Sequence, residues 1–246
     1  MKFFLILIGS VIAVFMGMGT IYFWGMGQIH PKYEHVFFTP KTPWIALPYS
    51  QEQELQKISD AIVWMDVYRN SQSTFVVDSK DSNSSLADLL KKWSGRGIIL
   101  NINSNVEDID RQLSEFLPSY IKNSAILLQS EYDIILRATK ESFADIPYGS
   151  SQSDRMRFSV FAGMAPWPGG LISATPFHGD VYISALKWKS ISLVNKVVVD
   201  EIHRRQKYVL IGPLKNEDEL RQAQSLDADG YYIQNMQLLK SLTATH

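Results

Sequence analysis

The side chains that could do chemistry in this chain are a carboxylate and four amides. Each stands at the carboxyl end of an apolar segment of strand length. In a barrel of parallel strands these ends share one rim, and active sites are built there. We therefore expect one polar pocket, formed by Asp66, Asn101, Asn103, Gln129 and Gln234.

One carboxylate among amides is suited to hydrogen bonding and poorly suited to a hard divalent cation. Such a cation usually needs several charged or carbonyl oxygens. For Asp66 two interpretations stay open, namely a residue of the site and a turn-forming aspartate that bonds the following backbone. For the amides the alternative is that they only solvate the rim.

Other candidates are less easily placed in the same pocket. Trp167 stands between two prolines. Its rigidity would suit an anchor for a partner or a lipid headgroup, or the ring could fold back over the barrel. His178 precedes a predicted strand, at the wrong end of the barrel, and His203 lies in a predicted helix. The remaining histidines lie in a linker or at the terminus, so we expect no acid–base pair.

The elements that must position these residues alternate between strand and helix. We predict eight strands, at residues 44–49, 61–67, 97–103, 124–130, 157–164, 180–186, 207–214 and 229–235. Between them the apolar spacing is helical, and Asn216 with Glu219 forms the start signal of a helix. This order predicts an α/β fold of the (β/α)₈ TIM-barrel type. A doubly wound sheet is the competitor, but no glycine-rich loop follows the first strand.

The N-terminus has a different character. Between Phe3 and Trp24 there is no ionisable side chain. At a rise of ~1.5 Å per residue, such a helix is long enough for the ~30 Å hydrocarbon core of a bilayer. The run ends in aromatic residues, which suit the membrane interface. We favour an uncleaved anchor over a cleaved signal peptide.

The predicted organisation has three parts. Residues 1–28 are a transmembrane signal-anchor, residues 29–43 a proline-containing juxtamembrane linker, and residues 44–246 the barrel. The lipid bilayer is then a partner through Phe3 to Trp24. We expect a single-pass protein of the cell membrane, with its C-terminal domain outside the cytoplasm, in the periplasm.

Composition narrows the function classes. The chain has 24 basic and 25 acidic residues, for a net charge of −1, with no basic run. Because a nucleic-acid surface needs a basic patch, that class is excluded. The chain has no cysteine, which excludes a disulfide framework and a thiolate metal site.

Several segments in sequence order resemble one enzyme family. Residues 60–78, with the run Trp64-Met65-Asp66-Val67, are similar to the second strand and turn of the glycerophosphodiester phosphodiesterases. The likeness continues through residues 85–90, 97–103, 124–130, 200–220 and 228–234. The resemblance implies a (β/α)₈ barrel. It also implies hydrolysis of a glycerophosphodiester by two histidines and a divalent cation held by carboxylates.

The residues that this chemistry requires are mostly replaced. The family's Glu-x-Asp reads Trp64-Met65-Asp66, and its His-Asp turn reads Val77-Asp78. Its third-strand glutamate and lysine correspond to Asn101 and Asn103, and residues 44–50 lack the family's His-Arg-Gly. We therefore expect no cofactor, with Ca²⁺ or Mg²⁺ at Asp66 only if the ancestral site is retained.

Three hypotheses follow for the function. The first is a catalytically inactive, membrane-anchored member that acts as a binding or structural component of the cell envelope, with an envelope protein or a lipid headgroup as partner. The second is an active metal-dependent phosphodiesterase with a rearranged site. The third is a module that binds a glycan or a phospholipid headgroup through the amide-rich mouth.

Overall fold

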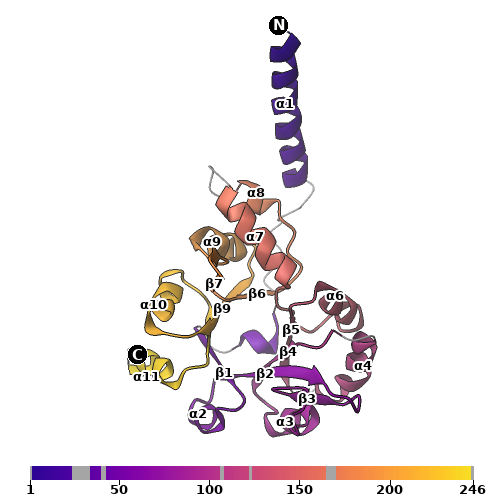
Figure 1. The fold of residues 1–246 in the computed structure, drawn as a ribbon, viewed down its shortest axis with the longest axis vertical. Coiled ribbons are helices and arrows are strands. Elements are labelled where there is room, and N and C mark those ends of the chain that lie inside the picture. The colour runs from indigo at the N-terminus through magenta and orange to yellow at the C-terminus, as the bar shows by residue number, and fades with distance from the viewer. Residues whose placement is uncertain are drawn as a thin grey trace.

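The computed structural model describes residues 2–23, 34–39, 43–105, 108–121, 124–164 and 170–244. In that part of the chain, parallel strands form a curled sheet in the order β5-β4-β2-β1-β10-β9-β6 (Figure 1). Their bounds are β1 Trp44–Pro48, β2 Ile62–Arg69, β4 Gly97–Ile102, β5 Ala125–Ser130, β6 Val181–Ser184, β9 Tyr208–Leu214 and β10 Gly230–Ile233. β1 pairs with both β2 and β10, so the sheet curls into a TIM-like barrel.

A segment without a strand assignment joins β5 to β6. The Leu128 N–H donates to the Pro147 carbonyl at 3.0 Å, and the Gly149 N–H donates to the Leu128 carbonyl at 2.8 Å. On the other side, the Val181 N–H donates to the Tyr148 carbonyl at 3.0 Å. Residues 147–150 therefore occupy the place between β5 and β6 and complete the ring.

The strand predicted at residues 157–164 is wrong, because these residues belong to α7 (Gln152–Met164). The helix starts at a reciprocal cap. The Ser151 N–H donates to Asp154 Oδ2 at 3.1 Å, and the Asp154 N–H donates to Ser151 Oγ at 3.2 Å. This local pairing satisfies backbone groups at the helix start, and it outweighs the β-like apolar pattern that follows. The other seven predicted strands are present, with slightly different ends.

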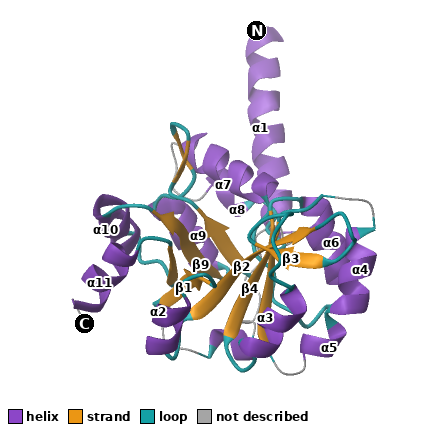
Figure 2. Cartoon of the chain, turned by 60° about the horizontal axis from the view of Figure 1, so that its bottom comes forward, coloured by secondary structure: helices purple, strands orange, loops and turns teal. Residues whose placement is uncertain are grey.

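Helices surround the barrel (Figure 2). They are α2 Glu52–Lys57, α3 Leu86–Lys92, α4 Ile109–Phe116, α5 Pro118–Ile121, α6 Asp133–Ser142, α8 Gly170–Ser173, α9 Lys196–Arg204, α10 Glu217–Ser225 and α11 Met236–Ala244. The predicted cap of α10 is confirmed, since Asn216 Oδ1 accepts from the Glu219 N–H at 2.9 Å. Three short strands lie outside the ring: β3 Phe75–Val77, which pairs with β2, and the hairpin of β7 Lys187–Trp188 and β8 Ile191–Ser192.

Part of the predicted linker belongs to the core. Residues Val36–Phe38 form the 3₁₀-helix η1, and Phe37 is completely buried in the inner cluster of the barrel. Phe38 stacks on Tyr208, with ring centroids 4.3 Å apart. Since Tyr208 begins β9, η1 covers the N-terminal end of the barrel. The domain therefore includes residues before the predicted boundary at residue 44.

The N-terminal helix α1 (Lys2–Phe23) extends away from the barrel (Figure 1). Its side chains are described for residues 6–17, and eight large apolar ones are exposed: Ile6, Leu7, Ile8, Val11, Ile12, Val14, Phe15 and Met16. Within the described residues, no helix has both the length and the apolar character needed to span a membrane, so the transmembrane helix predicted from the sequence is not found there.

Candidate functional site

The carboxylate and two of the predicted amides meet at the C-terminal rim of the barrel. Asp66 Oδ1 accepts hydrogen bonds from Asn101 Nδ2 at 2.7 Å and from Asn103 Nδ2 at 3.2 Å. β2 and β4 pair in register, so that Asp66 lies beside Asn101. The structure therefore brings these three residues together at one end of the barrel.

A third donor to the same oxygen comes from a residue that the sequence analysis did not assign to the site. Trp64 Nε1 donates to Asp66 Oδ1 at 3.1 Å. The Trp64 ring points into the barrel, because residues two apart on a strand share a face. It stacks on Tyr232 with centroids 4.2 Å apart and an interplanar angle of 12°. An aromatic pair therefore fills the barrel beneath the carboxylate.

Tyr232 connects the stack to the last predicted amide. Gln234 Nε2 donates to the Tyr232 hydroxyl at 3.0 Å, and Gln51 Nε2 donates to the main-chain carbonyl of Gln234 at 2.6 Å. Burial raises the pKa of Tyr232, so its hydroxyl is neutral at physiological pH. Gln234 directly follows β10 and thus lies at the same rim.

The carboxylate does not suit a cation. Asp66 Oδ1 faces three N–H groups, and the nitrogens of both asparagine amides, not their oxygens, point toward it. A hard cation requires oxygen ligands. Within the described residues there is also no group of three or more histidine, cysteine and acidic side chains that could hold a metal ion.

Gln129 lies deeper in the mouth and is 2% exposed. Its Nε2 donates to the Ser150 carbonyl at 2.9 Å, whereas its Oε1 is buried without a hydrogen-bond partner. Gly149 passes beside this amide, and a Cβ built on Gly149 would overlap Gln129 Oε1. The closing segment therefore leaves room for the glutamine side chain by having a glycine at this point.

An arginine at the start of α7 is the main site residue that the sequence analysis missed. Arg155 Nη2 donates to Glu131 Oε1 at 3.2 Å. Its Nη1 donates to the main-chain carbonyls of Ser150 at 3.2 Å and Ile183 at 3.4 Å. Burial lowers the pKa of Arg155, and nearby Glu131 opposes that shift. The signal that could have found this residue is the Ser151–Asp154 capping pair, which places the helix start at the rim.

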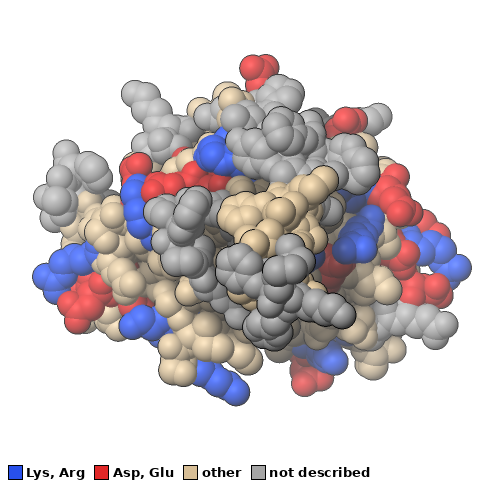
Figure 3. All heavy atoms as spheres, turned by 90° about the horizontal axis from the view of Figure 1, so that it is seen from above, with Lys and Arg blue, Asp and Glu red and all other residues tan. Residues whose placement is uncertain are grey.

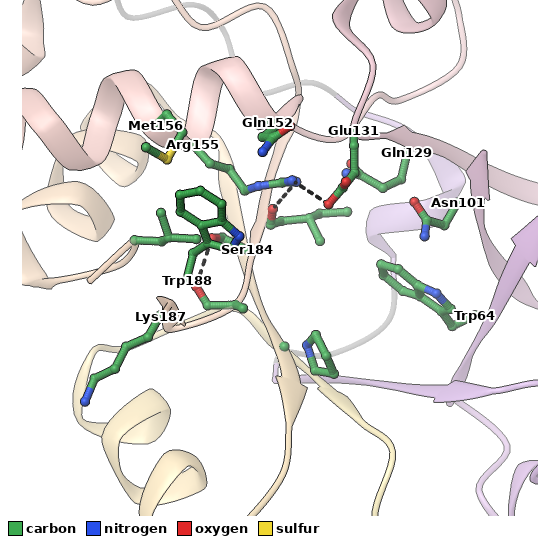
Figure 4. A pocket seen from close by; sticks show the side chains of 15 residues that line it. Trp64, Asn101, Gln129, Glu131, Gln152, Arg155, Met156, Ser184, Lys187 and Trp188 are labelled. Carbon is green, nitrogen blue, oxygen red and sulfur yellow. Dashed lines mark hydrogen bonds and ion pairs between the residues drawn. The ribbon is translucent and has the colours of Figure 1, made fainter. Parts of the chain in front are cut away.

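Some of these residues line a cavity of about 230 Å³, whereas Asp66, Asn103 and Gln234 do not belong to its lining. It lies between the ends of β2, β4 and β5 on one side and α7 with the β7–β8 hairpin on the other (Figure 4). Among its lining residues are Trp64, Asn101, Gln129, Glu131, Arg155 and Trp188. The two indole rings lie on opposite sides of the cavity in Figure 4.

The described histidines lie away from this mouth. His35 precedes η1, His178 precedes β6, and His203 at the end of α9 bonds Asp229, which precedes β10, at 2.9 Å. Burial lowers the pKa of His35. The hydrogen bond from Asp229 raises the pKa of His203, although burial opposes that shift.

Two further predictions concern the surface, namely the role of Trp167 and the exclusion of a nucleic-acid surface. Trp167 lies outside the described residues. On the face seen in Figure 3, basic and acidic side chains are interspersed.

Comparison with known proteins gives a fold but no close relative. No family model matches the sequence, and no curated protein matches it. The chain is similar in structure to the glycerophosphoryl diester phosphodiesterase domain of a protein from Mycobacterium tuberculosis. The TM-score is 0.61 at 10% identity, over 84% of this chain and 100% of that one.

Two other solved structures agree. A phosphodiesterase from Oleispira antarctica, solved in complex with the product sn-glycerol-3-phosphate, gives a TM-score of 0.56 at 14% identity, over 82% of this chain and 97% of that one. A glycerophosphodiester phosphodiesterase from Agrobacterium tumefaciens gives 0.54 at 7% identity, over 82% and 99%. The family resemblance seen in the sequence is therefore confirmed at the level of the fold.

Proposed function

We propose that this chain is a non-hydrolytic barrel of the glycerophosphodiester phosphodiesterase type, a pseudoenzyme that acts as a binding component of the cell envelope. The observation that carries the proposal is the state of Asp66. Its Oδ1 is held by three N–H donors, one of them from Trp64, which stands where the family has a metal-binding glutamate. The fold is kept, and the carboxylate serves a hydrogen-bond network.

The positions of the histidines support the same proposal. Hydrolysis of a phosphodiester needs groups that move protons to and from the reacting oxygens. The described histidines His35, His178 and His203 belong to the opposite end of the barrel. The ionisable residues of the cavity lining are Glu131, Arg155 and Lys187, and the first two are paired with each other.

The test is an assay of the full-length chain, purified in detergent, with glycerophosphocholine in the presence of Ca²⁺ or Mg²⁺. We expect no release of glycerol phosphate above that of a boiled control. We also expect no thermal shift with either metal, because a ligand that binds the folded state raises its stability by mass action. Metal-dependent release that disappears in Asp66→Ala would overturn the proposal and favour an active enzyme with a rearranged site.

Membrane anchoring is part of this proposal. Its support is the uncharged stretch from Phe3 to Trp24 and the exposed apolar side chains of α1. The full-length chain should sediment with membranes and resist extraction at high salt, whereas a variant starting at Glu34 should not. Protease added outside spheroplasts should digest the barrel if it lies in the periplasm. A full-length chain that stays in the supernatant would refute the anchor.

A further inference from the structure

The cavity at the barrel mouth has a buried hydrogen-bond acceptor that the protein leaves unused. Gln129 cannot easily turn to satisfy it, because its Nε2 already donates to the carbonyls of Ser150 at 2.9 Å and Ser130 at 3.4 Å. Leaving a buried polar atom unsatisfied costs about 1–3 kcal/mol. A ligand with an O–H or N–H group at this point would remove that cost.

The charges around the cavity do not favour an anion. Arg155 is the buried cation of the lining, and Glu131 is already bonded to it at 3.2 Å. Lys187 also contributes to the lining, but Figure 4 shows its ammonium end turned away from the cavity. On the other wall, the amide of Asn101 is bonded to the Asp66 carboxylate. A phosphate placed here would meet a buried cation that is already paired with the carboxylate of Glu131.

The shape and the walls suit a small ring. The cavity of about 230 Å³ is smaller than the roughly 300–1,000 Å³ of sites for drug-sized ligands. Trp188 at the β7–β8 hairpin is 43% exposed, and the buried indole of Trp64 lies across the cavity from it. An indole offers a flat apolar surface with polar groups next to it. This combination fits the apolar face and the hydroxyl edge of a sugar.

We propose that this cavity binds a neutral polyhydroxylated ligand, a single sugar ring, without cleaving it. One hydroxyl donates to Gln129 Oε1, a second bonds the Glu131–Arg155 pair, and the ring lies against Trp188. The inference rests on the proposed function in that the mouth binds and does not hydrolyse. It goes beyond that function by replacing the phosphodiester with an uncharged ligand.

The experiment is a titration of the full-length chain in a detergent without a sugar headgroup. Binding is followed by calorimetry and by ligand-observed NMR. One arm uses D-glucose, D-galactose, D-mannose and N-acetyl-D-glucosamine, and the other uses sn-glycerol-3-phosphate and inorganic phosphate. We expect saturable binding of at least one sugar and none of either phosphate. Absence of saturation with all four sugars, or saturation with a phosphate alone, overturns the inference.

Two variants locate the site. Gln129→Met removes the unused acceptor at similar length and should weaken sugar binding about tenfold or more, as expected for the loss of one hydrogen bond to a buried group. Trp188→Ala should weaken sugar binding as well. Because the Trp188 ring is exposed, this variant should fold even if Gln129→Met does not. The matched control is Tyr132→Ala, whose aromatic ring is 39% exposed and does not belong to the lining. Equal weakening in the control would place binding elsewhere and refute the site.

The two proposals fail in different ways. Hydrolysis of glycerophosphocholine by the full-length chain would refute the pseudoenzyme, whatever the sugar titration shows. No hydrolysis together with no sugar binding would leave the pseudoenzyme standing and refute the ligand class.

Discussion

At the residue scale, the hydrogen bonds of Asp66 distinguish between the two interpretations that its place in the sequence allowed. Its carboxylate bonds side chains on two strands, Trp64 on β2 and both asparagines on β4. It therefore acts as the centre of a polar network at the rim and not as a local turn former. The same network explains why neutral amides follow the third predicted strand, since each amide supplies a donor to the carboxylate.

Removing the carboxylate should destabilise the barrel. In Asp66→Ala, the donors on Trp64, Asn101 and Asn103 lose their common acceptor, so the free energy of unfolding should fall by about 1–3 kcal/mol. Urea unfolding followed by circular dichroism measures this change. Asp81→Ala, at an exposed position, is the control and should stay within about 0.5 kcal/mol of the parent. An equal, small effect in both variants would show that the network contributes no stability.

The His203–Asp229 pair should make stability depend on pH. Because the Asp229 hydrogen bond raises the pKa of His203 above its ordinary value of 6.5, the folded state binds the proton more tightly than the unfolded state. The stabilisation is fully present below pH 6.5 and is lost as the pH rises through the raised pKa. Compared with His203→Gln, the parent should therefore gain stability at pH 5.5 and lose this advantage at pH 8.5.

Thermal unfolding at both pH values checks this expectation. The same substitution made in an Asp229→Asn background is the control. If His203→Gln changes the pH dependence as much there as in the parent, the pair is not its source.

At the scale of elements, the ring depends on a segment that is not a regular strand. Ser150 is completely buried. Its Oγ accepts from the Ile183 N–H at 3.0 Å and donates to the Ile183 carbonyl at 2.7 Å. The Ser150 side chain thus adds to the main-chain bond from Val181 to Tyr148 in joining residues 147–150 to β6. The same segment leads into α7, so barrel closure and the position of Arg155 have one structural cause.

Ser150→Ala should weaken this closure. The buried Ile183 N–H loses its partner, and we expect a loss of about 1–3 kcal/mol in the free energy of unfolding. Hydrogen exchange at the Ile183 amide should become faster, because the hydrogen bond to Ser150 Oγ is absent and local opening no longer has to break it. Ser59→Ala, at an exposed serine, should change neither quantity. Unchanged exchange at Ile183 in Ser150→Ala would contradict this account.

At the scale of the whole molecule, the two ends of the barrel differ in structure. The C-terminal end carries the polar network and the cavity. The N-terminal end is closed by η1, where Phe37 packs edge-on against Trp44 with centroids 6.1 Å apart. A segment expected to link the anchor to the barrel therefore also supplies part of the barrel core.

Phe37→Ala tests this role. Truncating a fully buried phenylalanine costs about 3–5 kcal/mol, so the variant should unfold at a much lower urea concentration than the parent. Val36→Ala, at a residue that is 61% exposed, is the neighbouring control. For the same reason, a soluble variant should start at Glu34 and not at Trp44. A stable variant that starts at Trp44 would show that the packing of Phe37 is not needed for the barrel to fold.

The sequence by itself determined the barrel class, seven of the eight strand positions and the meeting of Asp66, Asn101 and Asn103. These features follow from local apolar runs and from the rule that parallel strands end at one rim. Residues 157–164 were misread as a strand because a short apolar run does not distinguish a strand from a buried helix. Only the tertiary structure decided that residues 147–150 close the ring, that Arg155 reaches the mouth and that Phe37 plugs the other end. Each of these depends on contacts between segments that are distant along the chain, and local propensity carries no information about such contacts.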